Sequence, residues 1–384
     1  MKGGFVIMSM IAFFPWLKIK SNFDLGDITL ITFNDSKPHE ITESEKRIIN
    51  ERVIKHYLDR SNNPIDKCTI VLQKDKKIFE DFNEDEREFL FSFAEILAFS
   101  GLSKREFFGF GFGYCNRDDF NFVIQSFAKD SDGVTMVTRR RDGSTKSFVS
   151  SDAYKITMPF NITSNEVEID INLAQALLQI QRKSPDIWFR FSDALFFFNR
   201  ANTDSNQITE HQEIVMTISA FERFLDCRSG SEKELIEKFL EVFTTEDSLD
   251  VSQSKRISNS GYKGNAKTLK EIWLRDFFRM RGEYAHGKRL SKRPIIWLPH
   301  EHLLLGSYVF PLLFKILLSK YGFYKLVEDD IDDINLFEQL TDADIFKKPK
   351  DSKSWEWNII RSDYKFSKSI ERAYRKAERD FKKA

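Results

Sequence analysis

The pattern of apolar residues changes near residue 160, and this change divides the chain into parts of different fold class. Before it, strand-like runs such as residues 26–34 and 67–75 alternate with helix-like runs such as 42–60 and 85–100. From about Asn165 onward, nearly every segment carries apolar residues at helical spacing. The sequence therefore predicts an α+β domain followed by an all-α bundle.

The first domain, residues 1–160, is expected to contain a mostly antiparallel sheet. Its last part is a series of strand-like pieces, residues 121–128, 133–140 and 144–150. Asp142-Gly143 separates the last two and is a turn signal typical of a β-hairpin. Consecutive strands joined by short turns pair antiparallel.

The second domain, residues 165–325, is expected to be a bundle of about five to six helices. A segment rich in Ser, Asn and Gly, residues 252–267, predicts a loop between two of them. The predicted helices each combine an apolar stripe with a charged face, and they cover residues 171–183, 187–201, 208–226, 231–243, 268–287 and a run beginning near His302.

Residues 326–384 form a C-terminal extension of different character. Residues 327–346 are acidic, whereas residues 361–384 predict a basic helix with apolar residues on roughly one face. We interpret that helix as one that docks through its apolar face and leaves its charged face in solvent. Contact with RNA or a protein partner is the alternative. The apolar residues are Phe366, Ile370, Ala373, Ala377 and Phe381.

The overall charge and the cysteines exclude several classes of protein. Lys plus Arg equals Asp plus Glu at 59 each, so any contact with nucleic acid must come from local basic patches. The three cysteines show no metal-ligand or disulfide spacing, which favours a reduced, intracellular protein. No cofactor and no metal are expected.

Two apolar runs raise the question of a membrane. Residues 1–20 resemble a secretory signal, but bulky residues stand where a cleavage site needs small ones, so a buried strand is favoured over a signal or anchor. Residues 303–318 are short for a bilayer span and contain Pro311 and Lys315, so a buried bundle helix is favoured. We therefore expect a cytoplasmic protein without membrane contact.

Several apparent motifs are better explained by structure than by chemistry. The glycines of residues 107–115 lack dinucleotide-binding spacing, and alternating Phe and Gly there favours a strand. His300 and His302 lack a third metal ligand nearby, so we expect a helix start after Pro299 instead. We expect the remaining histidines outside residues 277–289 to be exposed: His39, His56 and His211.

A basic hairpin offers one possible contact with phosphate. Arg139, Arg140, Arg141 and Lys146 flank the predicted turn, and guanidinium groups bind phosphates with two parallel hydrogen bonds. Charged hairpin tips are common for solubility alone, and we favour this explanation over contact with nucleic acid.

The stretch FFRMRGEYAHGKR, residues 277–289, combines the residue types needed for metal-free RNA cleavage. A histidine such as His286 can take the proton of a ribose 2′-hydroxyl or protonate the leaving 5′-oxygen. An arginine can neutralise the charge that develops on the phosphate. Two copies related by a two-fold axis supply both an acid and a base.

Two arginines are candidates for this role. Arg279 precedes His286 by seven positions and returns almost to the same face of a helix. Arg281 precedes it by five positions, which leaves a wide angular offset that its long side chain must span. Gly282 and Gly287 are expected to loosen the helix and relax this offset.

The R-x4-H arrangement of Arg281 and His286 in a C-terminal bundle resembles the HEPN superfamily of helical nucleases and nucleotide-binding modules. The segments SDALFFFNRANTDSNQ, EIVMTISAFERFLD and LRDFFRMRGEYAHG are similar to its Apea-like branch in particular. The resemblance covers about residues 165–325. FFPWLKI, residues 13–19, with the following GDITLITFN, is similar to the start of some Apea-like proteins.

The resemblance implies a homodimeric, metal-independent endoribonuclease that acts in antiviral defence, abortive infection or a toxin system. Its first domain would sense an invader-derived protein or nucleic acid, or regulate the nuclease. The alternative is a catalytically inactive module that dimerises and binds a nucleotide, RNA or protein, with the charged residues forming salt bridges that close the bundle. The implied catalytic residues are Arg281, His286, Arg279 and Glu222, with Glu222 orienting Arg281 or His286. The candidate RNA-binding residues are the hairpin arginines Arg139, Arg140 and Arg141, together with Lys288.

Overall fold

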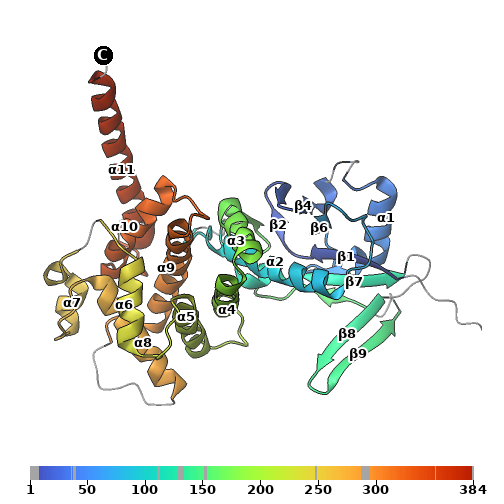
Figure 1. Ribbon diagram of the computed structural model, residues 1–384, viewed down its shortest axis with the longest axis horizontal. Coiled ribbons are helices and arrows are strands. Elements are labelled where there is room, and N and C mark those ends of the chain that lie inside the picture. Colours follow the sequence, from blue (N-terminus) through green and yellow to red (C-terminus); the bar gives the residue numbers. More distant parts are fainter. Residues whose placement is uncertain are drawn as a thin grey trace, which may run out of the picture. The chain divides into compact units, whose positions relative to one another are not determined.

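The computed structural model describes residues 8–35, 37, 40–109, 113–128, 134–150, 154–246, 249–286, 295–350 and 352–382. The chain forms two compact units, Met1–Leu178 and Gln179–Ala384 (Figure 1). The first contains an antiparallel sheet and the second consists of helices, so the predicted order of an α+β region and a helical bundle is confirmed. The division falls inside helix α3 (Ile171–Lys183).

A seven-stranded sheet organises the first unit. Every pairing within it is antiparallel, and the first strand of the chain lies at its centre. In spatial order the strands are β3 (Phe23–Leu25), β4 (Ile28–Thr32), β6 (Thr69–Gln73), β1 (Met8–Phe14), β7 (Val123–Ala128), β8 (Val134–Arg140) and β9 (Gly143–Val149). Two short parallel pairs lie outside it: β5 (Tyr57–Leu58) with β10 (Ile156–Thr157), and β2 (Lys18–Ile19) with β11 (Glu166–Val167).

Strand β1 is built from the apolar N-terminal run, and its burial explains the composition of that run. Phe13 faces Ile70 of β6 on one side and Val123 of β7 on the other. Both Phe13 and Phe14 are buried, because successive side chains of a central strand point to opposite covered faces. The prediction of a buried strand for this run is confirmed.

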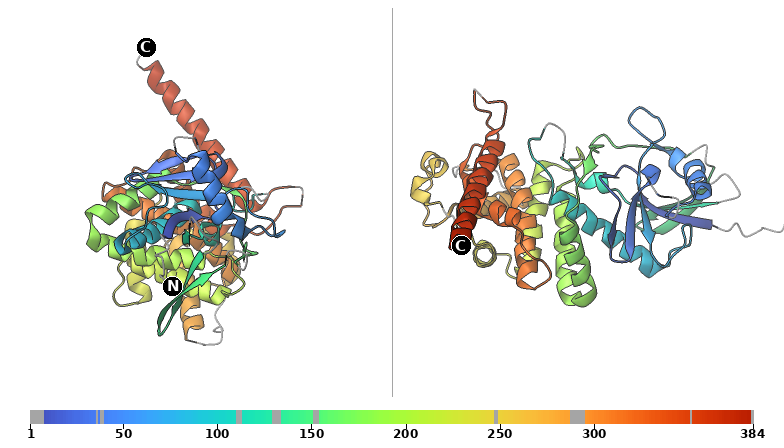
Figure 2. Two further views of the ribbon diagram at one scale, coloured as in Figure 1. Left: turned by 90° about the vertical axis from the view of Figure 1, so that its right-hand side faces the viewer. Right: turned by 90° about the horizontal axis from the view of Figure 1, so that it is seen from above.

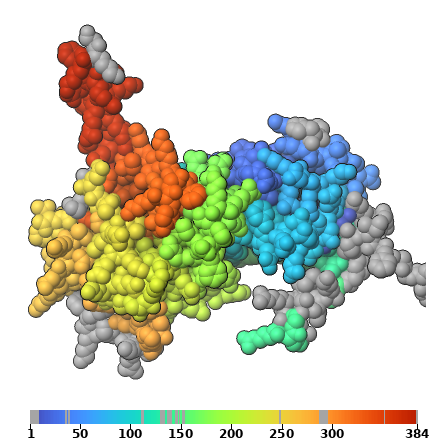
Figure 3. Space-filling model, viewed as in Figure 1, coloured from blue at the N-terminus to red at the C-terminus, as the bar shows by residue number. Residues whose placement is uncertain are grey.

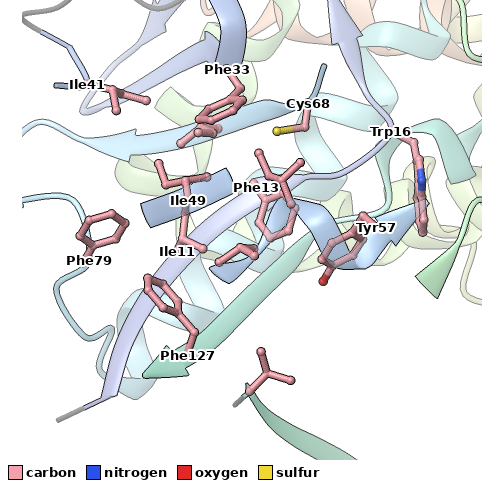
Figure 4. Close-up of a cluster of buried hydrophobic side chains, with 14 of the residues drawn as sticks. Ile11, Phe13, Trp16, Phe33, Ile41, Ile49, Tyr57, Cys68, Phe79 and Phe127 are labelled. Carbon is pink, nitrogen blue, oxygen red and sulfur yellow. The ribbon is translucent and has the colours of Figure 1, made fainter. Parts of the chain in front are cut away.

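One face of the sheet packs against α1 (Glu43–Arg52) through the cluster shown in Figure 4. Helix α1 starts at Thr42 with a capping box to Glu45. Figure 2 shows α2 (Glu84–Leu102) on the opposite side of the sheet from α1. The cluster between the sheet and α1 includes the apolar side chains of Ile11, Phe13, Ile49, Tyr57 and Phe127.

The helix predicted for residues 42–60 is shorter than expected. It ends at Arg52, since Val53 leaves the helical conformation with φ −125° and ψ −66°. A 3-10 turn follows, and Tyr57 then enters β5 and packs edge-on against Phe13 with ring centroids 5.1 Å apart. His56, expected to be exposed, is fully buried by this arrangement.

The Phe and Gly segment of residues 107–115 is not a strand in its described parts, 107–109 and 113–115. Phe108 and Gly113 have positive φ values of 57° and 79°, which interrupt extended backbone. The Arg105 guanidinium instead lies over the rings of Phe107 and Tyr114, at 4.7 and 5.5 Å from their centroids. Phe107 and Tyr114 therefore pack around a buried arginine, and they do not form the aromatic face of a strand.

The second unit is a helical bundle whose helices match the predicted segments, with two additions: the short helix α7 and the helix α10 in the acidic segment. Ser254 caps a short helix, α7, inside the segment expected to be a loop, and its hydroxyl donates to Asp342. The helices are α4 (Pro185–Ala201), α5 (Glu210–Phe224), α6 (Glu232–Val242), α7 (Lys255–Ser260), α8 (Leu269–Ala285), α9 (Pro299–Lys320), α10 (Glu328–Asp342) and α11 (Glu356–Phe381).

Helix α9 forms the centre of this bundle. Its Phe314 stacks on Phe224 of α5 with centroids 3.9 Å apart, and its Phe310 stacks on Phe198 of α4 at 4.6 Å. Among the described helices it alone is long and apolar enough to cross a membrane, but most of its apolar window is buried inside the unit. Burial of this kind is typical of a core helix, as predicted from its sequence.

Helix α11 docks in the opposite way to the prediction. Its basic face meets the acidic helix α10, where Arg361 and Lys365 pair with Asp333 at 3.5 and 3.4 Å. The apolar stripe faces outward, with Phe366 67% and Phe381 85% exposed. The ion pairs with α10 and the buried Trp357 and Tyr364 hold α11 in this orientation, and α11 extends beyond the rest of the unit (Figures 1 and 3).

Candidate functional site

The candidate site lies on α8, whose sequence explains its position. Thr268 caps the helix by accepting a hydrogen bond from the Glu271 amide. Trp273, Phe277 and Met280 are buried and anchor one side of α8 in the bundle. The opposite side of the helix is left to charged residues.

Helix α8 continues without a break through Gly282 to Ala285, so the expected loosening at Gly282 is wrong. The amide of His286 still donates to the Gly282 carbonyl at 3.2 Å. Flanking turns of good helix geometry outweigh the conformational freedom of a single glycine. A Cβ atom at Gly282 would meet nothing within 4 Å, so this position faces open space. Gly287 lies outside the described residues.

The regular helix decides which arginine shares a face with His286. At about 100° per residue, Arg279 and His286 lie about 20° apart around the axis, whereas Arg281 and His286 lie about 140° apart. His286 is exposed, and the Arg279 side chain is 46% exposed. Arg279 and His286 therefore belong to one accessible face of α8.

Arg281 is committed to a different contact. Its Nη2 lies 3.2 Å from Glu222 Oε2 on α5, and its guanidinium lies over the Phe278 ring, 5.6 Å from the centroid. The two charged side chains are 25% and 13% exposed. Burial raises the pKa of Glu222, although Arg281 opposes this shift. The structure thus brings the predicted pair Glu222 and Arg281 together, with the guanidinium beside the Phe278 ring of the preceding turn.

Arg279 is held by a carboxylate that the sequence did not reveal. Its Nε and Nη2 lie 2.9 and 3.2 Å from the two carboxylate oxygens of Glu232, on the first turn of α6. Arg275 binds the same carboxylate at 2.6 Å and Glu271 at 3.1 Å. The only signal in the sequence is the spacing of Arg275 and Arg279, which places both on one face of a helix.

A pocket of about 520 Å³ opens on this same face of α8. One wall is the α8 surface from Glu271 to Arg279, and the other is the segment that follows α7. The sequence predicts only a loop for that segment, and its composition gives no signal of a binding site. The lining residues are Gly261, Tyr262, Lys263, Gly264, Asn265, Ala266, Glu271, Ile272, Arg275, Asp276, Arg279 and Ile296.

Two other histidines of the bundle, His302 and His211, contact neighbouring side chains of α8. His302 is fully buried, 3.1 Å from Asp276 Oδ2, and stacks on Phe277. His211 is exposed as expected and stacks on Tyr284 with ring centroids 3.8 Å apart. Helix α9 begins at Pro299, as predicted. Within the ranges that the structure describes, no group of three or more His, Cys, Asp or Glu could hold a metal ion.

The predicted RNA-binding residues are only partly described. Arg139 and Arg140 end strand β8 and Arg141 lies exposed in the turn, so the predicted hairpin is present. The side chains of Arg139, Arg140 and Lys146 lie outside the described part of the chain, as does the whole of Lys288.

Three comparisons with known proteins found no match for this chain. No protein-family model matches the chain, no curated protein matches it, and no solved structure matches it.

Proposed function

We propose that the helical unit is a metal-independent endoribonuclease of HEPN type that acts as a homodimer. One observation carries the proposal: an unbroken helix holds Arg279 and His286 on one accessible face. Of the two arginines, we assign the working role to Arg279, because it shares a face of α8 with His286, whereas Arg281 lies about 140° away around the axis and pairs with Glu222. Arg281 and Glu222 then act as positioning residues that fix α8 against α5.

The proposed reaction is transesterification at an RNA phosphate. An imidazole removes the proton of the 2′-hydroxyl, and the 2′-oxygen attacks phosphorus. The bond to the 5′-oxygen breaks, and this oxygen takes a proton as it leaves, so that a 2′,3′-cyclic phosphate and a 5′-hydroxyl are formed. Arg279 neutralises the charge on the non-bridging oxygens. Glu232 keeps the guanidinium in place between turnovers.

Two imidazoles are needed, one as base and one as acid, and the described α8 face of one chain offers His286 alone. A second copy related by a two-fold axis supplies the other imidazole. This requirement of the chemistry is why we propose a homodimer.

The test is cleavage of labelled total RNA in EDTA by wild type and His286→Ala, with analysis of the product ends. We expect cyclic phosphate ends from the wild type and no cleavage by His286→Ala, with the dimer intact. Arg279→Ala should lower the rate by about 10²- to 10³-fold, the usual effect of removing one oxyanion-stabilising group. His211→Ala, which changes another exposed histidine of the unit, should cleave normally. Cleavage retained by His286→Ala would refute the proposal.

A second candidate function follows from a separate observation. Both guanidiniums are already paired with carboxylates, Arg279 with Glu232 and Arg281 with Glu222, which would suit a module that binds a partner or nucleotide without catalysis. Overexpression distinguishes the two, because the nuclease arrests growth and His286→Ala relieves the arrest. The binding module leaves growth unchanged in both cases.

The wider role that we propose is antiviral defence, abortive infection or a toxin-like growth arrest in the cytoplasm. The first unit then senses an invader-derived protein or nucleic acid, or regulates the nuclease. Adding a phage lysate to the cleavage assay tests this role. We expect stimulated cleavage by the full chain, and equal rates with and without lysate would count against a sensor.

A further inference from the structure

We infer that the pocket beside Arg279 binds a nucleobase of the RNA strand, next to the phosphate that is cleaved. This inference rests on the proposed function, and it names the part of the substrate that the site would recognise. The pocket volume of about 520 Å³ lies within the range of about 300–1,000 Å³ that suits small organic ligands.

The walls of the pocket carry the groups that bases need. Tyr262 is half-buried and offers an aromatic ring for stacking, and Asn265 offers both a donor and an acceptor to a base edge. Gly264 leaves room for the ring in this position, because a Cβ there would lie 2.0 Å from the Tyr262 hydroxyl and 2.3 Å from its ring, so that the ring would have to move.

The charges favour a base over a phosphate in the depth of the pocket. The Arg275 guanidinium is bound by two carboxylates, Glu232 at 2.6 Å and Glu271 at 3.1 Å, so its charge is already compensated. A phosphate placed there would meet Glu271, which lines the pocket, whereas a phosphate at Arg279 needs to displace Glu232 alone. A neutral aromatic ring with polar edges avoids the repulsion and can use the same groups as hydrogen-bond partners.

The position of Arg279 links the pocket to the reaction. Arg279 lines the pocket and shares its face of α8 with His286, which is about 10 Å further along the helix axis. A strand whose phosphate lies between these two side chains therefore brings a neighbouring base over the pocket. Tyr262 and Asn265 are then specificity-determining residues that do not take part in the proton transfers.

The inference is tested with the full chain and uncleavable 2′-O-methyl oligonucleotides, by fluorescence anisotropy. Each homopolymer of A, C, G or U is compared with an abasic strand of equal length. We expect at least one homopolymer to bind wild type about tenfold more tightly than the abasic strand, as for one stacked base. Tyr262→Ala and Gly264→Ala should remove this preference, and Tyr262→Trp should keep it. Tyr374→Ala, an exposed tyrosine on α11, is the matched control.

The outcomes separate the pocket from the chemistry. Equal preference for bases in wild type and Tyr262→Ala, with both proteins folded, would overturn the inference even if RNA is cleaved. Base preference that survives in His286→Ala and disappears in Tyr262→Ala supports it. If no RNA is cleaved under any condition but this pattern of binding holds, the nuclease proposal fails and the pocket stands.

Discussion

Removing the charge of Arg281 tests whether this arginine is structural. Arg281→Gln leaves Glu222 partly buried without its cationic partner. Breaking a buried ion pair costs about 3–5 kcal/mol, whereas breaking a surface pair costs about 0–1 kcal/mol. With side chains 25% and 13% exposed, the pair lies between these limits, and we expect a loss of about 2 kcal/mol at pH 7.

The loss should depend on pH with a definite sign. Burial raises the pKa of Glu222, and Arg281 opposes the shift, so Arg281→Gln raises this pKa further. A raised carboxyl pKa gives stability that is present below the unfolded pKa of about 4.3 and is lost as pH rises through the folded pKa. The difference between wild type and Arg281→Gln is therefore smallest near pH 4 and largest near pH 7.

Urea unfolding at both pH values measures the effect, and Arg223→Gln is the matched control. Arg223 neighbours Glu222 and pairs with Asp193 at 3.2 Å, but its side chain is 57% exposed. We expect a cost below about 1 kcal/mol for it at either pH. Glu222→Gln combined with Arg281→Gln should be more stable at pH 7 than Arg281→Gln alone. Equal, pH-independent losses in the two arginine variants would refute the reasoning.

Two further predictions concern stability and thiol reactivity. Gly282→Ala should stabilise the protein by about 0.5–1 kcal/mol, because the helix is regular there and the added Cβ meets no atom within 4 Å; a lower melting temperature would contradict this. Burial raises the pKa of the Cys68 thiol, and it raises that of Cys227 to about 12. Ellman's reagent at pH 8 should therefore label Cys68 only after unfolding and Cys227 slowly, and rapid labelling of native Cys68 would be inconsistent with its burial.

The sequence was informative wherever local pattern and burial agree. The apolar run of residues 303–318 became the buried helix α9, and the N-terminal run became β1, because each must hide its apolar residues whatever surrounds it. The β8–β9 hairpin followed from its turn residues, which act locally.

Failures arose where a distant partner decides the outcome. The orientation of α11 depends on carboxylates of α10 such as Asp333, which no periodicity within α11 reveals. His56 is buried because Tyr57 leaves the helix for a strand that pairs with Ile156, about a hundred residues later in the chain. Helical spacing alone does not contain such pairings.

The sequence predicts the reactive side chains of the candidate site, but not the partner of Arg279 or the pocket. Arg279 and His286 could be placed on one face from their spacing alone, and Glu222 was identified as a partner from its position in the preceding helix. The partner of Arg279, Glu232, lies on α6 and has no sequence relation to it. The pocket depends on how the chain folds back after α7, a tertiary property that a loop-like composition does not show.

The central place of β1 has a consequence for how the protein is made. Strand β1 is synthesised before both of its neighbours, β6, which begins at Thr69, on one edge and β7, which begins at Val123, on the other. At a synthesis rate of about 5–20 residues per second, roughly 5–20 s pass between β1 and β7. During that time the Met8–Phe14 segment is an apolar strand with an unpaired edge, the form most prone to aggregation, so the nascent chain depends on prompt arrival of β7 or on shielding until it comes.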